Sequence, residues 1–234
     1  MDTAVETRPG APLTRTRLAG GCLAAGALLL AVTAALDPPT PAGGLPELLA
    51  HTAAQPGRWT AWALCMTLTA LVLLPGVAAL GRAVPPGRGA ALTVAGTCAT
   101  GAGLVGMAVL GAAETHLPAL TAGVLPVAPQ TLEAAARLED APGLAVAFLL
   151  VLPGFYAGLP LLLWGLRRAR ALPLWVPVAA TAGSAASWFA SELPNPWEAL
   201  CRVPVVVALL VTSRLLLRPR TTSAAPSRSR EPVA

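Results

Sequence analysis

The amino-acid sequence predicts an all-α protein, a polytopic transmembrane helical bundle with about six spans and both termini in the cytoplasm. Three observations predict this class: an apolar composition, six apolar runs of membrane-spanning length and an uneven distribution of arginine. Hydrophobic residues make up 55% of the 234 residues and charged residues only 12%, about half the charged share of a soluble domain. The lipid bilayer of a cell (inner or plasma) membrane is therefore the expected partner of most of the surface.

Six segments approach the roughly 20 apolar residues that a helix needs to cross a bilayer. They are approximately 18–36, 59–80, 90–113, 143–166, 172–191 and 197–217. They form a predicted bundle of residues 18–217, between a cytoplasmic tail (1–17) and a disordered cytoplasmic tail (218–234). The first run also fits a cleaved signal peptide, but its length favours an uncleaved anchor.

The arginines predict the orientation of this bundle. All 16 basic residues are arginine, and 13 of them fall in the segments that would be cytoplasmic. Only Arg58 and Arg137 fall in outer loops, while Arg202 lies inside the last run. Such an excess is what the positive-inside rule describes. The arginines sit singly or in short groups beside apolar runs, so no nucleic-acid partner is expected.

Sequence motifs point to neither a metal site nor catalysis. The four cysteines occupy four different apolar segments and form no CxxC pair, so they predict small hydrophobic side chains in helices. No HExxH, GxSxG or P-loop pattern is present. We expect no cofactor and no catalysis by a familiar motif, and an enzyme is the least supported class.

Two Leu-Pro-Gly triplets mark predicted helix kinks at Pro75–Gly76 and Pro153–Gly154. A glutamate follows each proline at the same interval of 39 residues, Glu114 in the first case and Glu192 in the second. Most other matches between the two stretches are Ala or Leu, which this composition supplies by chance. The prediction is therefore two kinked helices and two carboxylates at the outer rim, rather than a proven repeat.

Small residues in the third run predict close helix packing. Gly101 to Gly106 matches the GxGxxG pattern of dinucleotide-binding folds, but that pattern requires a preceding strand. Here it lies inside a continuous apolar run. Ala99, Ala102, Gly103 and Gly106 instead predict a surface on which two membrane helices approach closely.

A polar cluster is expected at the outer level of the bundle. Its members are Glu114, His116, Glu192, Glu198 and Arg202. Arg202 lies inside an apolar run, where a charge usually faces the bundle interior or a wet cavity, and Glu198 shares its helix face four residues earlier. The cluster predicts an outer vestibule for a cation, a proton or an amine-bearing solute, and its residue types would also suit a divalent metal. The alternative is a set of ordinary solvated helix ends.

Three short stretches carry a family resemblance: Gln55-Pro-Gly-Arg-Trp59, Leu73-Leu-Pro-Gly76 and Gly165-Leu-Arg-Arg168. With them, residues 45–217 resemble uncharacterised small six-span integral membrane proteins of high-GC bacteria. That resemblance implies a bacterial membrane protein and implies no activity or functional residue.

Two functions from different classes fit these observations. The first is transport or sensing of a small solute or ion through an outer-facing cavity. The second is a non-catalytic membrane scaffold or accessory subunit that acts through helix–helix contacts with a protein partner or a second copy.

Overall fold

The structure, a computed structural model, describes residues 11–38, 44–84, 86–121, 128–190 and 195–217, and all regular secondary structure within them is helical. The predicted all-α helical bundle is confirmed. Most of the predicted N-terminal tail, the whole predicted C-terminal tail and Glu192 lie outside the described residues.

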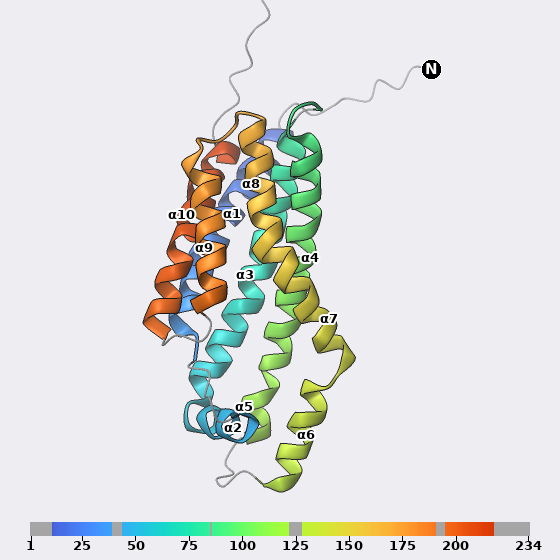
Figure 1. Ribbon diagram of the computed structural model, residues 1–234, viewed down its shortest axis with the longest axis vertical. Helices are drawn as coiled ribbons and strands as arrows, with labels where there is room; N and C mark the ends of the chain where they lie inside the picture. Colours follow the sequence, from blue (N-terminus) through green and yellow to red (C-terminus); the bar gives the residue numbers. More distant parts are fainter. Residues whose placement is uncertain (1–10, 39–43, 85, 122–127, 191–194, 218–234) are drawn as a thin grey trace, which may run out of the picture.

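Six helical segments stand side by side and form the bundle (Figure 1). They are α1 (Ala11–Leu36), α3 (Pro56–Ala83), α4 (Ala90–Glu114), a composite of α7 (Pro142–Val151), η1 (Leu152–Ala157) and α8 (Gly158–Arg168), α9 (Trp175–Phe189) and α10 (Asn195–Leu217). Each segment runs antiparallel to the one before it. α1 begins at Ala11, inside the stretch predicted as a tail, because a helix can continue past the hydrocarbon while Arg15 and Arg17 extend toward water.

Five of these segments are long and apolar enough to cross a membrane. The sixth predicted span, 172–191, forms α9, whose 15 residues extend about 22 Å, less than the roughly 30 Å of a hydrocarbon core. Pro173 lies before α9 and Pro177 lies in its first turn. Proline is disfavoured in a helix interior, and α9 begins between these two positions. The chain is therefore a multi-pass helical membrane protein, and the described part of its bundle contains five candidate spans and a shorter helix, α9.

The two ends of the bundle differ in charge and in structure. One end, which we call the basic end, carries the arginines at the start of α1, at the ends of α3, α8 and α10 and in the connecting loops: Arg15, Arg17, Arg82, Arg88, Arg167, Arg168, Arg170 and Arg214. At the opposite end lies a cap of three short helices, α2 (Leu45–Ala54), α5 (His116–Thr121) and α6 (Pro129–Glu139) (Figure 1).

The cap has a small apolar core of its own. Leu49, Trp59, Leu117 and Ala135 are each at most 7% exposed and pack together. Trp59 belongs to the first turns of α3, so it connects the cap to the bundle. Its ring meets that of Trp62 edge-on, with the centroids 5.8 Å apart. This contact fixes Trp62 at the level where the bundle meets the cap.

Glycine residues allow α4 to pack closely against the composite helix. A Cβ on Gly103 would collide with the backbone of Phe155, and one on Gly106 would lie 2.6 Å from the carbonyl oxygen of Ala147. A Cβ on Gly154 would lie 2.7 Å from the carbonyl oxygen of Ala99. Such close backbone approach requires glycine. Ala102 of the predicted surface is only half-buried.

The two predicted kinks differ in backbone structure. Pro75 lies inside α3, which continues as one helix from Pro56 to Ala83. Pro153 and Gly154 lie in η1, a π-helical turn of six residues. Proline has no N–H to donate to the residue four positions earlier, and a π turn shifts the hydrogen bonds to a spacing of five residues. The composite helix therefore changes its register at η1, in the middle of the bundle.

Candidate functional site

A cavity of about 100 Å³ lies where the six bundle segments converge, in the half of the bundle nearer the cap. Every segment contributes to its wall: Thr33 from α1, Thr69 from α3, Leu110 from α4, Tyr156 from η1, Ser184 from α9 and Arg202 from α10. A cavity that requires all six segments exists only in the folded bundle. Its residues come from positions 30 to 205 of the chain.

An ion pair forms part of the cavity wall. The Nη2 of Arg202 lies 3.1 Å from the Oδ2 of Asp37, and both residues line the cavity. Their side chains are 18% and 14% exposed, respectively. Mostly buried charges are stable in pairs, because each supplies the interactions that water would otherwise give. The pair thus places one cation and one anion, with no net charge, beside the cavity.

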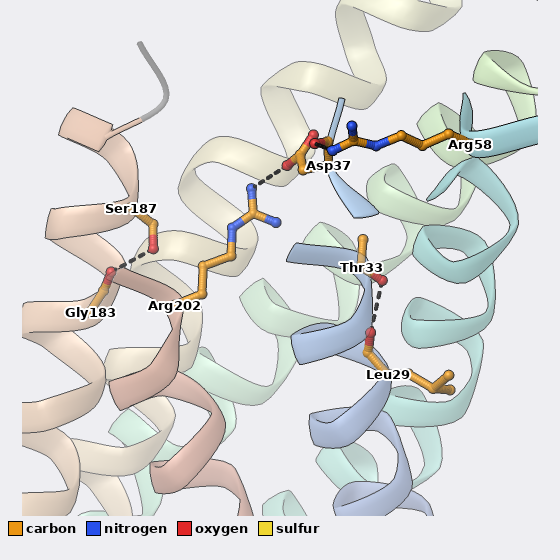
Figure 2. A network of polar contacts seen from close by, with 7 residues as sticks. All are labelled: Leu29, Thr33, Asp37, Arg58, Gly183, Ser187 and Arg202. Atoms are coloured by element: carbon orange, nitrogen blue, oxygen red, sulfur yellow. Dashed lines mark hydrogen bonds and ion pairs between the residues drawn. The ribbon is translucent and has the colours of Figure 1, made fainter. Parts of the chain in front are cut away.

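Arg58 holds the backbone that carries Asp37. Figure 2 shows Arg58 and Arg202 approaching Asp37 from opposite sides. The Nε of Arg58 donates to the carbonyl oxygen of Leu36 at 3.1 Å, and its Nη2 donates to that of Asp37 at 2.8 Å. Leu36 ends α1, and carbonyls at a helix C-terminus lack partners within the helix. Arg58 therefore satisfies this terminus and leaves the Asp37 carboxylate turned toward Arg202.

Two polar atoms in the cavity wall have no hydrogen-bond partner among the described residues, Trp62 Nε1 and Ser184 Oγ. Ser184 is 5% exposed, and both atoms are shielded from solvent. A buried polar group without a partner costs about 1–3 kcal/mol, so such groups usually meet water or a ligand. Both unpartnered atoms line the same cavity, which makes that cavity a candidate binding site.

The other hydroxyls around the cavity are satisfied within the protein. Ser187, on the same helix as Ser184, donates to the carbonyl oxygen of Gly183 at 2.8 Å (Figure 2). Thr33 and Thr69 lie 3.1 Å apart, oxygen to oxygen, and join α1 to α3. Each hydroxyl also lies within hydrogen-bond distance of a carbonyl oxygen of its own helix, so its single proton goes either to that carbonyl or to the other threonine. The unpartnered state is thus specific to Ser184 and Trp62 rather than a general property of the wall.

Packed leucines close the cavity toward the basic end. Below the cavity, one helical turn or more further from the cap, lie Leu23, Leu73, Leu104, Leu159 and Leu162, each at most 1% exposed. Met66, Met107, Leu110 and Phe155 make the cavity wall itself largely apolar. The arrangement is a mainly apolar pocket with a few polar groups, the form that small-molecule sites usually take.

The predicted outer polar cluster is distributed differently. Arg202 lines the cavity. Glu114 ends α4, and His116 is exposed, with its Nδ1 3.2 Å from the carbonyl oxygen of Ala113. Neither residue lines the cavity. Glu192 and the side chain of Glu198 lie outside the described part of the chain, so their membership and the Glu198–Arg202 pair stay predictions.

Sequence reasoning missed Asp37, Trp62 and Ser184. Asp37 had a usable signal, because it directly follows an apolar run at the same outer level as Arg202, and an intramembrane arginine usually has a partner. Trp62 lies near the end of an apolar run, where tryptophan is common in membrane helices, and Ser184 is one of many small residues in its helix. Neither position differs in sequence from ordinary membrane-helix residues.

Comparison of the chain with protein-family models, curated proteins and solved structures finds no match. Within the described residues, no three His, Cys, Asp or Glu side chains gather as a metal site would require. The fold and the site define a class: a multi-pass α-helical membrane protein with a mainly apolar cavity that contains two unpartnered polar groups.

Proposed function

We propose that the protein binds a small solute in this cavity, as the recognition step of transport or sensing. In this proposal it resides in the cell membrane of a bacterium, with both termini in the cytoplasm and the cavity near the outer face. The arginine-rich basic end supports that orientation. The observation that carries the proposal is the pair of unpartnered atoms, Trp62 Nε1 and Ser184 Oγ, in one cavity.

The polar groups favour a solute with a hydrogen-bond acceptor. The indole N–H of Trp62 can only donate, and the Ser184 hydroxyl can donate as well. A solute that presents hydrogen-bond acceptors, such as carbonyl-type oxygens, to these two groups would satisfy them. The Asp37–Arg202 ion pair adds a fixed dipole on the same wall. This differs from the cation or amine that an acidic outer cluster would favour.

Thermal unfolding of the purified protein tests this function. Acetamide, acetate and methylammonium serve as neutral, anionic and cationic probes small enough for the cavity. Acetamide should raise the unfolding midpoint of the native protein in a concentration-dependent manner, since a ligand that binds only the folded state stabilises it. Ser184→Ala should lose this response. Ser187→Ala is the matched control, because its hydroxyl already donates to Gly183. No response to any of the three probes would refute the proposed function.

The scaffold alternative has less support. Its expected contact surface included Gly103 and Gly106, and both pack inside the chain's own bundle against Phe155 and Ala147. A bulky residue there would disturb the fold before it disturbed any partner. The lipid-facing surface is apolar over several helices, and no described patch on it favours a protein partner over lipid.

A further inference from the structure

A groove on the outside of the bundle shares two of its lining residues with the cavity. It has a volume of about 570 Å³ and lies between η1 and α8 on one side and α9 on the other. Its outer parts are apolar and open: Phe189 is 81% exposed, Trp188 47% and Leu161 41%. In a multi-pass membrane protein, such an exposed apolar surface on the outside of the bundle suits contact with the hydrocarbon of the bilayer.

Two contacts between the helices mark the ends of the groove. Toward the basic end, Trp164 Nε1 donates to Thr181 Oγ1 at 3.2 Å. Toward the cap, the rings of Tyr156 and Trp188 meet edge-on, with their centroids 6.0 Å apart. Thr181 and Trp188 are seven residues apart on α9, which is roughly 10 Å along a helix. The groove is thus an elongated opening between two bridges.

Ser184 lies on α9 between these two contacts, at the boundary that the groove and the cavity share. It lies one turn from Thr181 and one turn from Trp188, and it lines the groove and the cavity alike. Tyr156 is the second shared residue. Ser184, whose hydroxyl has no partner among the described residues, therefore forms part of the wall of both the apolar groove and the cavity. Tyr156 belongs to the π-helical turn η1, a feature that often occurs at functional sites.

We propose that the solute is a single-chain amphiphile with an uncharged, hydrogen-bond-accepting head, which reaches the cavity from the bilayer through this groove. The head lies in the cavity near Ser184 and Trp62, and the chain lies in the groove. The larger volume of the groove and its apolar wall fit a hydrocarbon chain. An uncharged head fits because the Asp37–Arg202 pair is already neutral, and a charged head would need a counter-charge in a buried site. This inference rests on the proposed function.

The experiment uses the full-length protein in phosphatidylcholine nanodiscs. Binding of decanamide, decanoate, decylammonium and acetamide is measured from the shift of the thermal unfolding midpoint with concentration. Decanamide should bind at least about a hundredfold more tightly than acetamide, since burial of each methylene adds to the transfer free energy. It should also bind at least about tenfold more tightly than either charged homologue.

Variants on the rim of the groove separate this inference from the proposed function. Ala185 lines the groove and is exposed, and Ala182 is exposed on the same helix outside the groove. Ala185→Trp should weaken decanamide binding at least about tenfold by filling the groove and leave acetamide binding unchanged. Ala182→Trp should change neither. Ala157→Leu, across the groove, should reproduce the effect of Ala185→Trp.

The binding results separate three claims: the lateral groove, the uncharged head and the proposed function itself. Decanamide that binds no more tightly than acetamide, or binding that Ala185→Trp and Ala157→Leu leave intact, would overturn the lateral groove while the proposed function stands. Decanoate or decylammonium that binds better than decanamide would overturn the uncharged head. If neither the decyl compounds nor acetamide, acetate and methylammonium bind the native protein, the proposed function fails together with this inference.

Discussion

Arg202 and Asp37 form an ion pair, 3.1 Å between Nη2 and Oδ2, although they lie 165 positions apart in the chain. The pair joins the last helix of the bundle to the end of the first. Both side chains are mostly buried, and Arg58 holds the Asp37 backbone from the other side (Figure 2). The stability of the cap-side half of the bundle should therefore depend on these residues.

Removing one charge of this pair should destabilise the protein. Asp37→Asn or Arg202→Gln should each cost about 3 kcal/mol, the low end of the range for a broken buried pair, because each side chain retains some exposure. The double variant should lose less than the sum of the two, since it leaves no unpaired charge. Equilibrium unfolding in one detergent measures all three variants.

The control for this comparison of single and double variants is the ion pair between Glu133 and Arg137 on α6. Its side chains are 66% and 77% exposed, respectively, so Arg137→Ala should cost less than about 1 kcal/mol. If the Asp37 and Arg202 variants unfold as the Arg137 variant does, the buried pair contributes no more than a surface pair. That result would also remove the polar wall from the proposed site.

Ser184→Ala should raise the stability of the ligand-free protein. Its hydroxyl is buried without a partner among the described residues, and removal of such a group is neutral or favourable by up to about 1–3 kcal/mol. Ser187→Ala, three residues further along α9, should lower stability because its hydroxyl donates to Gly183 at 2.8 Å. Opposite signs for two buried serines of one helix are easily measured by thermal unfolding. Equal losses in both would mean that Ser184 has a partner in the protein.

The glycines of the third run should differ sharply in their tolerance of a methyl group. Gly103→Ala should cost roughly 1–3 kcal/mol, the usual range for overpacking, because the new Cβ would collide with the Phe155 backbone. Gly101→Ala meets nothing within 4 Å and should gain up to about 1 kcal/mol from helix propensity. Gly101 and Gly103 lie two positions apart on the same helix, so the unfolding midpoints of their alanine variants can be compared directly. Equal effects would contradict the packing of α4 against η1.

Fusions can test the orientation and the short helix α9. Alkaline phosphatase, which is active only outside the cytoplasm, should be inactive when fused after Ala171 and active when fused after Asn195. A fluorescent protein fused after Leu217 should be fluorescent, as expected for a cytoplasmic end. These results would agree with the positive-inside rule. Activity after Ala171, or inactivity after Asn195, would contradict the six-span topology, and the second result would indicate that α9 does not cross the membrane.

The long helices could be predicted because each depends on a local property of the chain. A run of about 20 apolar residues forms a spanning helix since every backbone group must be satisfied within the segment. The expected spans 59–80 and 90–113 correspond closely to α3 (Pro56–Ala83) and α4 (Ala90–Glu114). The prediction was least accurate at 172–191, where α9 is shorter than the apolar run, and at 11–17, where α1 begins earlier than expected.

The candidate site was predictable only at Arg202, whose charge inside an apolar run needed an explanation. Glu114 and His116 were grouped with Arg202 because all three lie near the same end of their apolar runs. That level along the bundle does not determine which side of a helix faces the bundle centre. Asp37 reaches Arg202 because Arg58 binds the backbone at the end of α1. No local pattern encodes that arrangement.

The sequence by itself determined the class of protein: apolar runs set the number and length of the helices, and the arginines mark one end of the bundle. Only the tertiary structure decided which side chains meet. The packing of α4 against the composite helix depends on glycine contacts with particular backbone atoms, and the cavity depends on all six segments at once. Helix formation is a local property of the chain, whereas helix rotation and partner choice are set by contacts between residues far apart in it.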